Sequence, residues 1–282
     1  MKKLLFIYAL MQSITSFAQR QYKQADQCRY EAIYTLTYKE DSTELNDLKT
    51  EDFILQIGDS LTVFQSYNQY LTDSIYIARD IWNLPKSEGM QLIFNRPKTA
   101  FMYVIIKSRR SGKLSYQETV MIDTYGYEED MGKLAWEIQS ESKILEGYTC
   151  QKATTRYGGR DYEAWFSPDI PIQSGPYKFG GLPGLIVQLY DTQEHYTFEL
   201  SALRKKERKP LYLLNEKVLR MNKEKFSQQK KYMNENWNQE FERRTGSQQT
   251  YEVNGVRKTA QEMDQMRREN QKHKNNPIEL SW

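Results

Sequence analysis

Histidine and cysteine, two of the residue types that often carry catalysis, are scarce in this sequence. Its 282 residues include two histidines, His195 and His273, and two cysteines, Cys28 and Cys150. A nucleophilic triad needs a histidine next to a serine or cysteine nucleophile. His195 follows a predicted turn and His273 belongs to a polar helix, and neither has a nucleophile-elbow partner. We therefore expect no catalytic triad.

Metal, phosphate and cofactor patterns are also missing. Glu128-Glu129-Asp130 offers oxygen ligands, but no acidic loop with calcium-binding spacing follows. Gly158-Gly159 and Gly180-Gly181 do not match a phosphate-binding loop. We expect no metal site, no cofactor and no catalytic residue that the sequence can name. A glycosidase-type pair of carboxylates stays open, because such a pair has no fixed spacing.

Residues 1–18 predict an export signal. Met-Lys-Lys precedes a short apolar run, Leu4 to Met11, and Ser16-Phe17-Ala18 offers a small-residue cleavage site. The apolar run is shorter than the roughly 20 residues that a membrane span needs. We expect cleavage after Ala18 and an exported protein, periplasmic or extracellular, that is not an integral membrane protein.

Export changes the interpretation of the two cysteines. An oxidising compartment favours pairing, so we expect a disulfide between Cys28 and Cys150. Closing so long a loop would stabilise the fold by up to about 4–5 kcal/mol. The alternative is two free, buried thiols.

Charge changes abruptly at residue 204. The formal net charge is only +3, so the chain is no polycation of the kind that binds nucleic acid. Residues 19–203 carry a net charge of −7 and residues 204–274 carry +9. We interpret 19–203 as a β-rich domain and 204–282 as a basic helical C-terminal extension packed on the same domain.

Alternating apolar positions predict strands in the acidic part. Tyr30, Ala32, Tyr34, Leu36 and Tyr38 occupy every second position, and the same pattern recurs in 53–57 and 196–200. A turn at Gly58-Asp59 leads into 61–64, and 101–106 is a continuous apolar run that suits a strand buried on both faces. Gly158-Gly159 predicts a tight turn within a hairpin over 148–166, in which paired positions sum to 317. Lys152 would then face Trp165.

The basic part predicts helices. Asn222 can cap a helix that presents an apolar stripe and ends at Gly246; the stripe comprises Phe226, Met233, Trp237 and Phe241. Thr259 and Glu262 form a capping box for a second, more polar helix. We expect the first helix to dock on the sheet and residues 257–274 to stay free for an anionic partner. The predicted fold is mainly β (α+β), a curved antiparallel sheet or half-barrel with one or two C-terminal helices; a β-sandwich is the alternative.

A proline- and glycine-rich segment over 168–184 cannot be helical. One interpretation is a structural crossover whose leucines plug the core. The other is a binding loop on a rigid scaffold. That second interpretation places Tyr177, Lys178 and Phe179 at an exposed tip, with Trp165 close by.

The same segment contains the run Gly181, Leu182, Pro183, Gly184, Leu185, Ile186. This run resembles the signature of the GLPGLI family of secreted bacterial proteins. Flanking residues also look like that family: Gly147-Tyr148, Cys150, Tyr162, Ala164-Trp165-Phe166, Asp169-Ile170-Pro171 and Asn276-Pro277-Ile278-Glu279-Leu280. The resemblance implies export and a β-rich domain with no established activity, and it brings no catalytic or binding residues.

The sequence thus favours an exported cell-envelope binding or assembly protein without enzymatic activity. Tyrosine and tryptophan suit contact surfaces. Its partner would be an envelope component, either glycan, lipid or protein, and not nucleic acid; the sequence does not define an oligomeric state. The alternative is a secreted hydrolase that uses two carboxylates about 5–10 Å apart.

Overall fold

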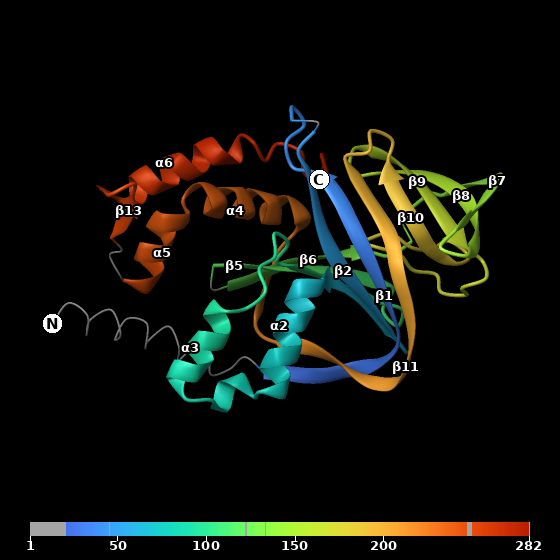
Figure 1. The fold of residues 1–282 in the computed structure, drawn as a ribbon, viewed down its shortest axis with the longest axis horizontal. Helices are drawn as coiled ribbons and strands as arrows, with labels where there is room; N and C mark the ends of the chain where they lie inside the picture. Colours follow the sequence, from blue (N-terminus) through green and yellow to red (C-terminus); the bar gives the residue numbers. More distant parts are fainter. Residues whose placement is uncertain (1–20, 45, 122, 133, 247–249, 282) are drawn as a thin grey trace.

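A computed structural model describes residues 21–281 except 45, 122, 133 and 247–249. The predicted export signal therefore lies outside the described residues. The described chain forms one 12-stranded sheet in the order β12-β6-β5-β4-β3-β2-β1-β11-β10-β9-β8-β7, and a separate β13–β14 hairpin (Figure 1). Neighbouring strands of the sheet are antiparallel except β12 and β6, which are parallel.

The strands have the following bounds: β1 Gln21–Lys39, β2 Leu48–Gly58, β3 Leu61–Ser66, β4 Tyr103–Ser108, β5 Lys113–Val120, β6 Asp123–Asp130, β7 Glu137–Leu145, β8 Tyr148–Tyr157, β9 Arg160–Ser167, β10 Leu185–Asp191, β11 Tyr196–Asn215, β12 Val218–Arg220, β13 Tyr251–Val253 and β14 Val256–Lys258. The helices are α2 Tyr67–Ala78, the short η1 Ile81–Asn83, α3 Lys86–Phe94, α4 Lys223–Glu235, α5 Trp237–Thr245 and α6 Ala260–Gln271.

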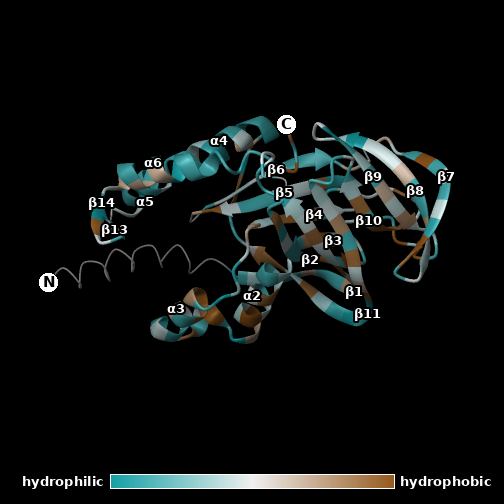
Figure 2. Cartoon of the chain, turned by 45° about the horizontal axis from the view of Figure 1, so that its top comes forward, coloured by the Kyte–Doolittle hydropathy of each residue, from teal (hydrophilic) through white to brown (hydrophobic). Residues whose placement is uncertain are grey.

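The predicted mainly β fold is confirmed. The alternation over 30–38 places Ala32, Tyr34 and Leu36 on one fully buried face of β1. The core lies on the inner face of a single curved sheet, so the sandwich alternative is not what the described residues form. Figure 2 shows apolar residues concentrated in the strands, while the α4–α6 arm is mostly hydrophilic.

Irregular pairing curves this sheet. The β1–β11 ladder shifts register at three places along its length. Each extra residue bends its strand and increases the local twist. The sheet curls without closing, and β12 and β7 form its two edges. Residues 168–184 fill the hollow, with Ile170, Tyr177, Phe179 and Leu182 buried in the core.

The predicted hairpin is confirmed in register. Arg156 pairs with Asp161, and Lys152 pairs with Trp165 across the Gly158-Gly159 turn. Both glycines have positive φ, as this turn type requires. The two-residue turn alone sets which side chains face each other along ten-residue β8.

Helices differ more from prediction. The helices α2 and α3 were not expected, and the C-terminal part contains three helices instead of one or two because the first predicted helix breaks at Asn236. Residues 257–274 are not free. Asp264 of α6 is fully buried and accepts hydrogen bonds from the backbone amides of Asn238 and Gln239, which caps α5.

The charge change at residue 204 is not a structural boundary. Strand β11 starts in the acidic part at Tyr196 and ends in the basic part at Asn215. It pairs with β1 over nearly its whole length. The assignment of 204–282 as a helical extension is therefore corrected, since the helices begin only at Lys223.

The predicted disulfide is wrong, because Cys28 and Cys150 are separate buried thiols. Strands β11, β10 and β9 lie between β1 and β8, which puts the two cysteines roughly 19 Å apart along the sheet at about 4.8 Å per strand. Disulfides need Cα atoms within about 7 Å. The bulge after Cys28 also turns its side chain into a small cluster with Val63 and Leu211, apart from the main core that holds Cys150.

Thiol titration tests this correction. We expect denatured, unreduced protein to release two reactive sulfhydryls per chain with a colorimetric thiol reagent. The thiols should react slowly in the native protein, since both are buried. A titre of zero would show that Cys28 and Cys150 do form a disulfide.

Gly184 tests how the motif fits the sheet. A Cβ at this position would lie 2.1 Å from the carbonyl oxygen of Ser167, so Gly184→Val must separate β9 from β10. We expect a loss of at least about 3 kcal/mol in urea unfolding. Gly181→Ala is the control: it has positive φ but open space around it, so it should cost only about 1–2 kcal/mol. Equal losses would contradict the packing described.

Candidate functional site

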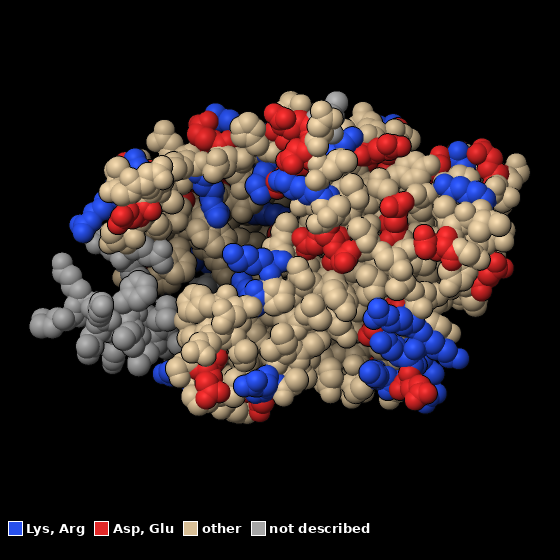
Figure 3. All heavy atoms as spheres, viewed as in Figure 1, with Lys and Arg blue, Asp and Glu red and all other residues tan. Residues whose placement is uncertain are grey.

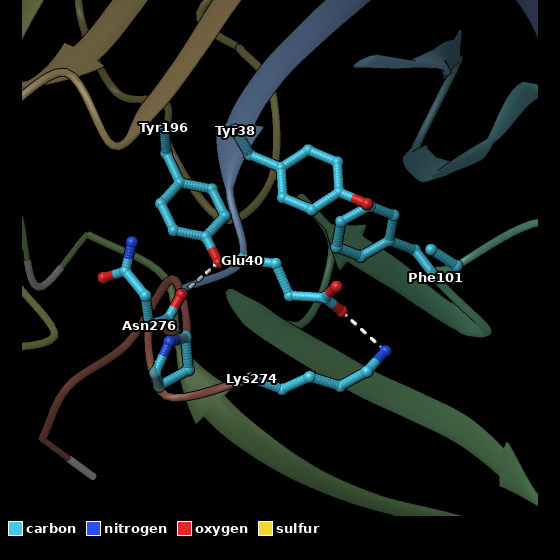
Figure 4. Close-up of a pocket in the computed structure, with 8 residues that line it drawn as sticks. Tyr38, Glu40, Phe101, Tyr196, Lys274 and Asn276 are labelled. Carbon is cyan, nitrogen blue, oxygen red and sulfur yellow. Dashed lines mark hydrogen bonds and ion pairs between the residues drawn. The ribbon is translucent and has the colours of Figure 1, made fainter. Parts of the chain in front are cut away.

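An aromatic pocket lies where β1 and β11 meet the C-terminal segment. Its volume is about 140 Å³. The lining residues are Tyr38, Glu40, Ala100, Phe101, Tyr196, Lys274, Asn276 and Pro277. Figure 4 shows the three aromatic rings on one side and the polar groups on the other.

The strand ladder positions the aromatic wall. Tyr38 near the end of β1 pairs directly with Tyr196 at the start of β11, and their rings stack 6.1 Å apart. Phe101 approaches Tyr38 edge-on at 5.1 Å. Its loop is held by Glu51, which accepts hydrogen bonds from the Thr99 hydroxyl and, at 3.0 Å, from the Ala100 amide. The wall is therefore fixed before any ligand arrives.

Charged groups form the rim. Glu40 contacts the ammonium groups of Lys274, at 2.6 Å, and Lys49 (Figure 4 shows the first). Burial alone would raise the pKa of Glu40, but the two lysines outweigh it and hold the pKa below its ordinary value. Asp47 lies 3.8 Å from the ammonium of Lys49, so two cations and two anions balance around the rim.

The C-terminal strap, residues 276–281, forms one side of this pocket. Arg160 donates to the Asn276 side chain at 2.5 Å and to the Pro277 carbonyl at 2.7 Å. Tyr196 donates to the Asn276 carbonyl at 2.6 Å, and the Leu280 amide donates to Gly158 at 2.6 Å. These bonds hold the strap across β8, β9 and β11.

A cluster of buried charges anchors the strap below the pocket. Glu279 is 1% exposed, and its carboxylate contacts the ammonium groups of Lys178 and Lys223, each at 2.6 Å. Tyr177 donates a hydrogen bond to it at 2.5 Å. Glu129 contacts the same two lysines at 2.9 and 3.0 Å. We call Glu129, Lys178, Lys223 and Glu279 the Glu279 cluster.

The cluster contains two nearby carboxylates, but they do not suit hydrolysis. A glycosidase general acid needs a raised pKa. Burial would raise the pKa of Glu129, yet Lys178 and Lys223 hold it below its ordinary value. Glu279 is shielded from solvent and paired with both lysines. Both carboxylates contact the same two lysines, so the pair holds elements together.

The binding residues predicted from the sequence do not lie at an exposed tip. Tyr177 is 2% exposed, and Lys178 and Phe179 are also buried, so that placement is wrong. The reason is that the strap and β6 cover the loop. Trp165 is buried as well, beneath the ammonium of Lys143 at 4.0 Å from the ring centre.

The pocket residues were missed by sequence reasoning. The alternating pattern identifies Tyr38 and Tyr196 only as strand residues. No neighbouring motif in the sequence indicates a binding pocket. The closing motif Asn276-Pro277 was the one available sign, but its partners lie more than one hundred residues away.

Lys107 is a buried amine that holds the motif loop. Its ammonium donates to the carbonyls of Gly175 at 3.1 Å and Phe179 at 2.6 Å. Burial lowers its pKa to about 7, because none of the described carboxylates forms an ion pair with it that would compensate the lost hydration. The folded protein therefore disfavours the charged form that the unfolded chain keeps up to about pH 10.4.

This linkage predicts a pH dependence. Between pH 7 and 9 the unfolded chain binds more protons at Lys107, so its contribution to the free energy of unfolding rises as pH rises. Lys107→Met should remove this slope of roughly 1 kcal/mol per pH unit. Urea unfolding of both proteins at several pH values measures the difference. If the free energy of unfolding depends on pH in the same way in both proteins, the lowered pKa of Lys107 is contradicted.

Comparisons with known proteins describe the fold and one segment. A family model described as a protein of unknown function (Porph_ging) matches residues 159–188, from β9 through the motif into β10. Two structures of PNGF-II, in space groups C2 and P21, are 13% identical to this chain, with TM-scores of 0.50 and 0.49. The similarity covers 72% and 71% of this chain and 32% of each PNGF-II chain, so this chain spans about a third of that protein.

At that identity the similarity describes the fold alone. No curated protein matches the chain significantly. Among the described residues, no group of three or more histidine, cysteine, aspartate and glutamate side chains is arranged to hold a metal ion. No described helix is both long enough and apolar enough to cross a membrane.

Proposed function

We propose that this chain is an exported, non-enzymatic binding protein of the cell envelope, and that the aromatic pocket binds a single sugar residue of an envelope glycan. The observation that carries the proposal is the pairing of a preformed aromatic wall with a charged rim. Aromatic faces pack against the apolar face of a ring, and polar groups at the edge fix its orientation.

Size and charge favour a sugar over other envelope components. A volume of about 140 Å³ suits one small ring and is too short for an acyl chain. The rim charges balance, with Lys49 and Lys274 matched by Glu40 and Asp47, which favours a neutral sugar whose hydroxyl groups can donate to Glu40 and accept from Lys274. A secreted hydrolase is the weaker candidate, since both carboxylates of the Glu279 cluster are paired with the same two lysines and Glu279 is buried.

We also propose that the protein is exported. Residues 1–18 carry the export pattern. We also propose that the chain belongs to the GLPGLI family: the family-model match over 159–188 contains the whole run 181–186.

Ligand-observed NMR tests the pocket. A panel of neutral, amino and acidic monosaccharides is titrated against the protein, and neutral sugars should bind best. Phe101→Ser should weaken that binding roughly fivefold to tenfold, because one ring wall is lost. Phe94→Ser is the matched control: this ring is 75% exposed on α3, outside the pocket, and its loss should leave binding unchanged. If no sugar binds, or if Phe101→Ser binds as well as the unaltered protein, the proposal fails.

A further inference from the structure

The two longest strands bend sharply at one point. Cys28 of β1 pairs with Lys209 of β11, while Tyr30 pairs with Lys205. Three β11 residues, 206–208, therefore face the single β1 residue Arg29. Such a bulge bends a ribbon and turns its side chains outward. Arg208 in this bulge has φ 44°, a left-handed conformation that is costly for a residue with a side chain.

Cations are concentrated at this bend. Arg204, Lys205, Arg208 and Lys209 are all exposed, and we call these four the basic corner. Lys206 beside them pairs with Glu31 at 2.6 Å, but none of the ion pairs formed by the described residues involves the four. Figure 3 shows lysine and arginine side chains gathered over the lower end of β11, where the surface protrudes.

The need to protect the exposed edge of β11 from pairing with other strands does not account for this much charge. Strand β10 pairs with β11 only at residues 197–199, so β11 has no described strand on that side at 204–209. One charge or one bulge is enough to block unwanted strand addition. Glu207 is exposed among the four cations and leaves them with a net charge of +3. Like charges so close repel one another, and an anionic partner would relieve this repulsion.

We propose that the basic corner docks the protein on an anionic lipid surface. A convex corner touches a flat surface with all its cations at once, whereas a glycan chain or a peptide needs a groove. Neither described pocket includes a residue of the basic corner. Each lysine or arginine near an anionic membrane strengthens binding by about fivefold, so four give a substantial affinity.

The location complements the sugar pocket without depending on it. The pocket lies at one end of the β1–β11 ladder, beside Tyr38 and Tyr196, while the basic corner lies at Cys28 and Lys209 further along. A protein held to a membrane at the corner would present the pocket away from the lipid. Lipid docking and sugar binding can therefore succeed or fail separately.

Vesicle co-sedimentation tests the proposal. The chain from Gln19, which holds every described residue, is mixed with phosphatidylcholine vesicles that lack or contain about 30% phosphatidylglycerol. We expect binding only to the anionic vesicles, with most of it lost between about 50 and 500 mM NaCl. Replacing Arg204, Lys205, Arg208 and Lys209 together by glutamine should lower the partition coefficient more than tenfold.

The matched control removes the same charge elsewhere. Lys86, Lys225, Lys231 and Lys272 are exposed far along the chain from the basic corner, on or at the end of helices, and their joint replacement by glutamine should leave vesicle binding within about twofold. If the corner variant melts early, Lys205→Gln with Lys209→Gln replaces it. Equal loss in both variants, or salt-independent binding, overturns the proposal. Binding to soluble dextran sulfate but not to anionic vesicles also overturns it and assigns the corner to acidic polysaccharide.

Discussion

The buried carboxylate of Glu279 connects four separate segments of the chain. It comes from the C-terminal strap and meets Lys178 of the motif loop and Lys223 at the start of α4. Glu129 of β6 contacts both lysines as well. One cluster thus joins the strap, the loop, the helical arm and the sheet. A buried ion pair adds little net stability, but removing one member leaves an uncompensated charge that costs about 3–5 kcal/mol. The cluster therefore specifies which segments come together.

The Glu279 cluster also determines the shape of the pocket. Asn276 and Pro277 line it only while the strap lies across the sheet, and Glu279 keeps the strap there. Close approach at the Gly158-Gly159 turn makes this possible, since a Cβ on Gly158 would lie 2.9 Å from Glu279. The Gly158-Gly159 turn thus sets the register of the β8–β9 hairpin and also leaves room for the C-terminal strap. The same two glycines are needed for the fold and for the shape of the pocket.

Local signals in the sequence predicted local structure well. Two glycines set the register of the β8–β9 hairpin, and Asn222 and Thr259 cap helices as expected, because each depends only on nearby residues. Helix α2 was missed because Ser66 makes no side-chain cap and its first turn has no acidic residue. Tyr177 and Lys178 were placed outside because their partner, Glu279, is about one hundred residues away. The cysteine pairing was wrong for a related reason. An oxidising compartment allows thiols to form a disulfide, but the order of the strands in the sheet determines whether two cysteines are close enough to do so.

Peptide complementation tests the central role of Glu279 most directly. A chain that ends at Asn275 is melted alone and with a synthetic peptide of residues 276–281. We predict that the shortened chain melts about 10 °C or more below the full chain and that the peptide restores most of the difference. A peptide carrying Glu279→Gln should restore little. If the shortened chain melts with the full chain, or both peptides act alike, the Glu279 cluster does not hold the fold together.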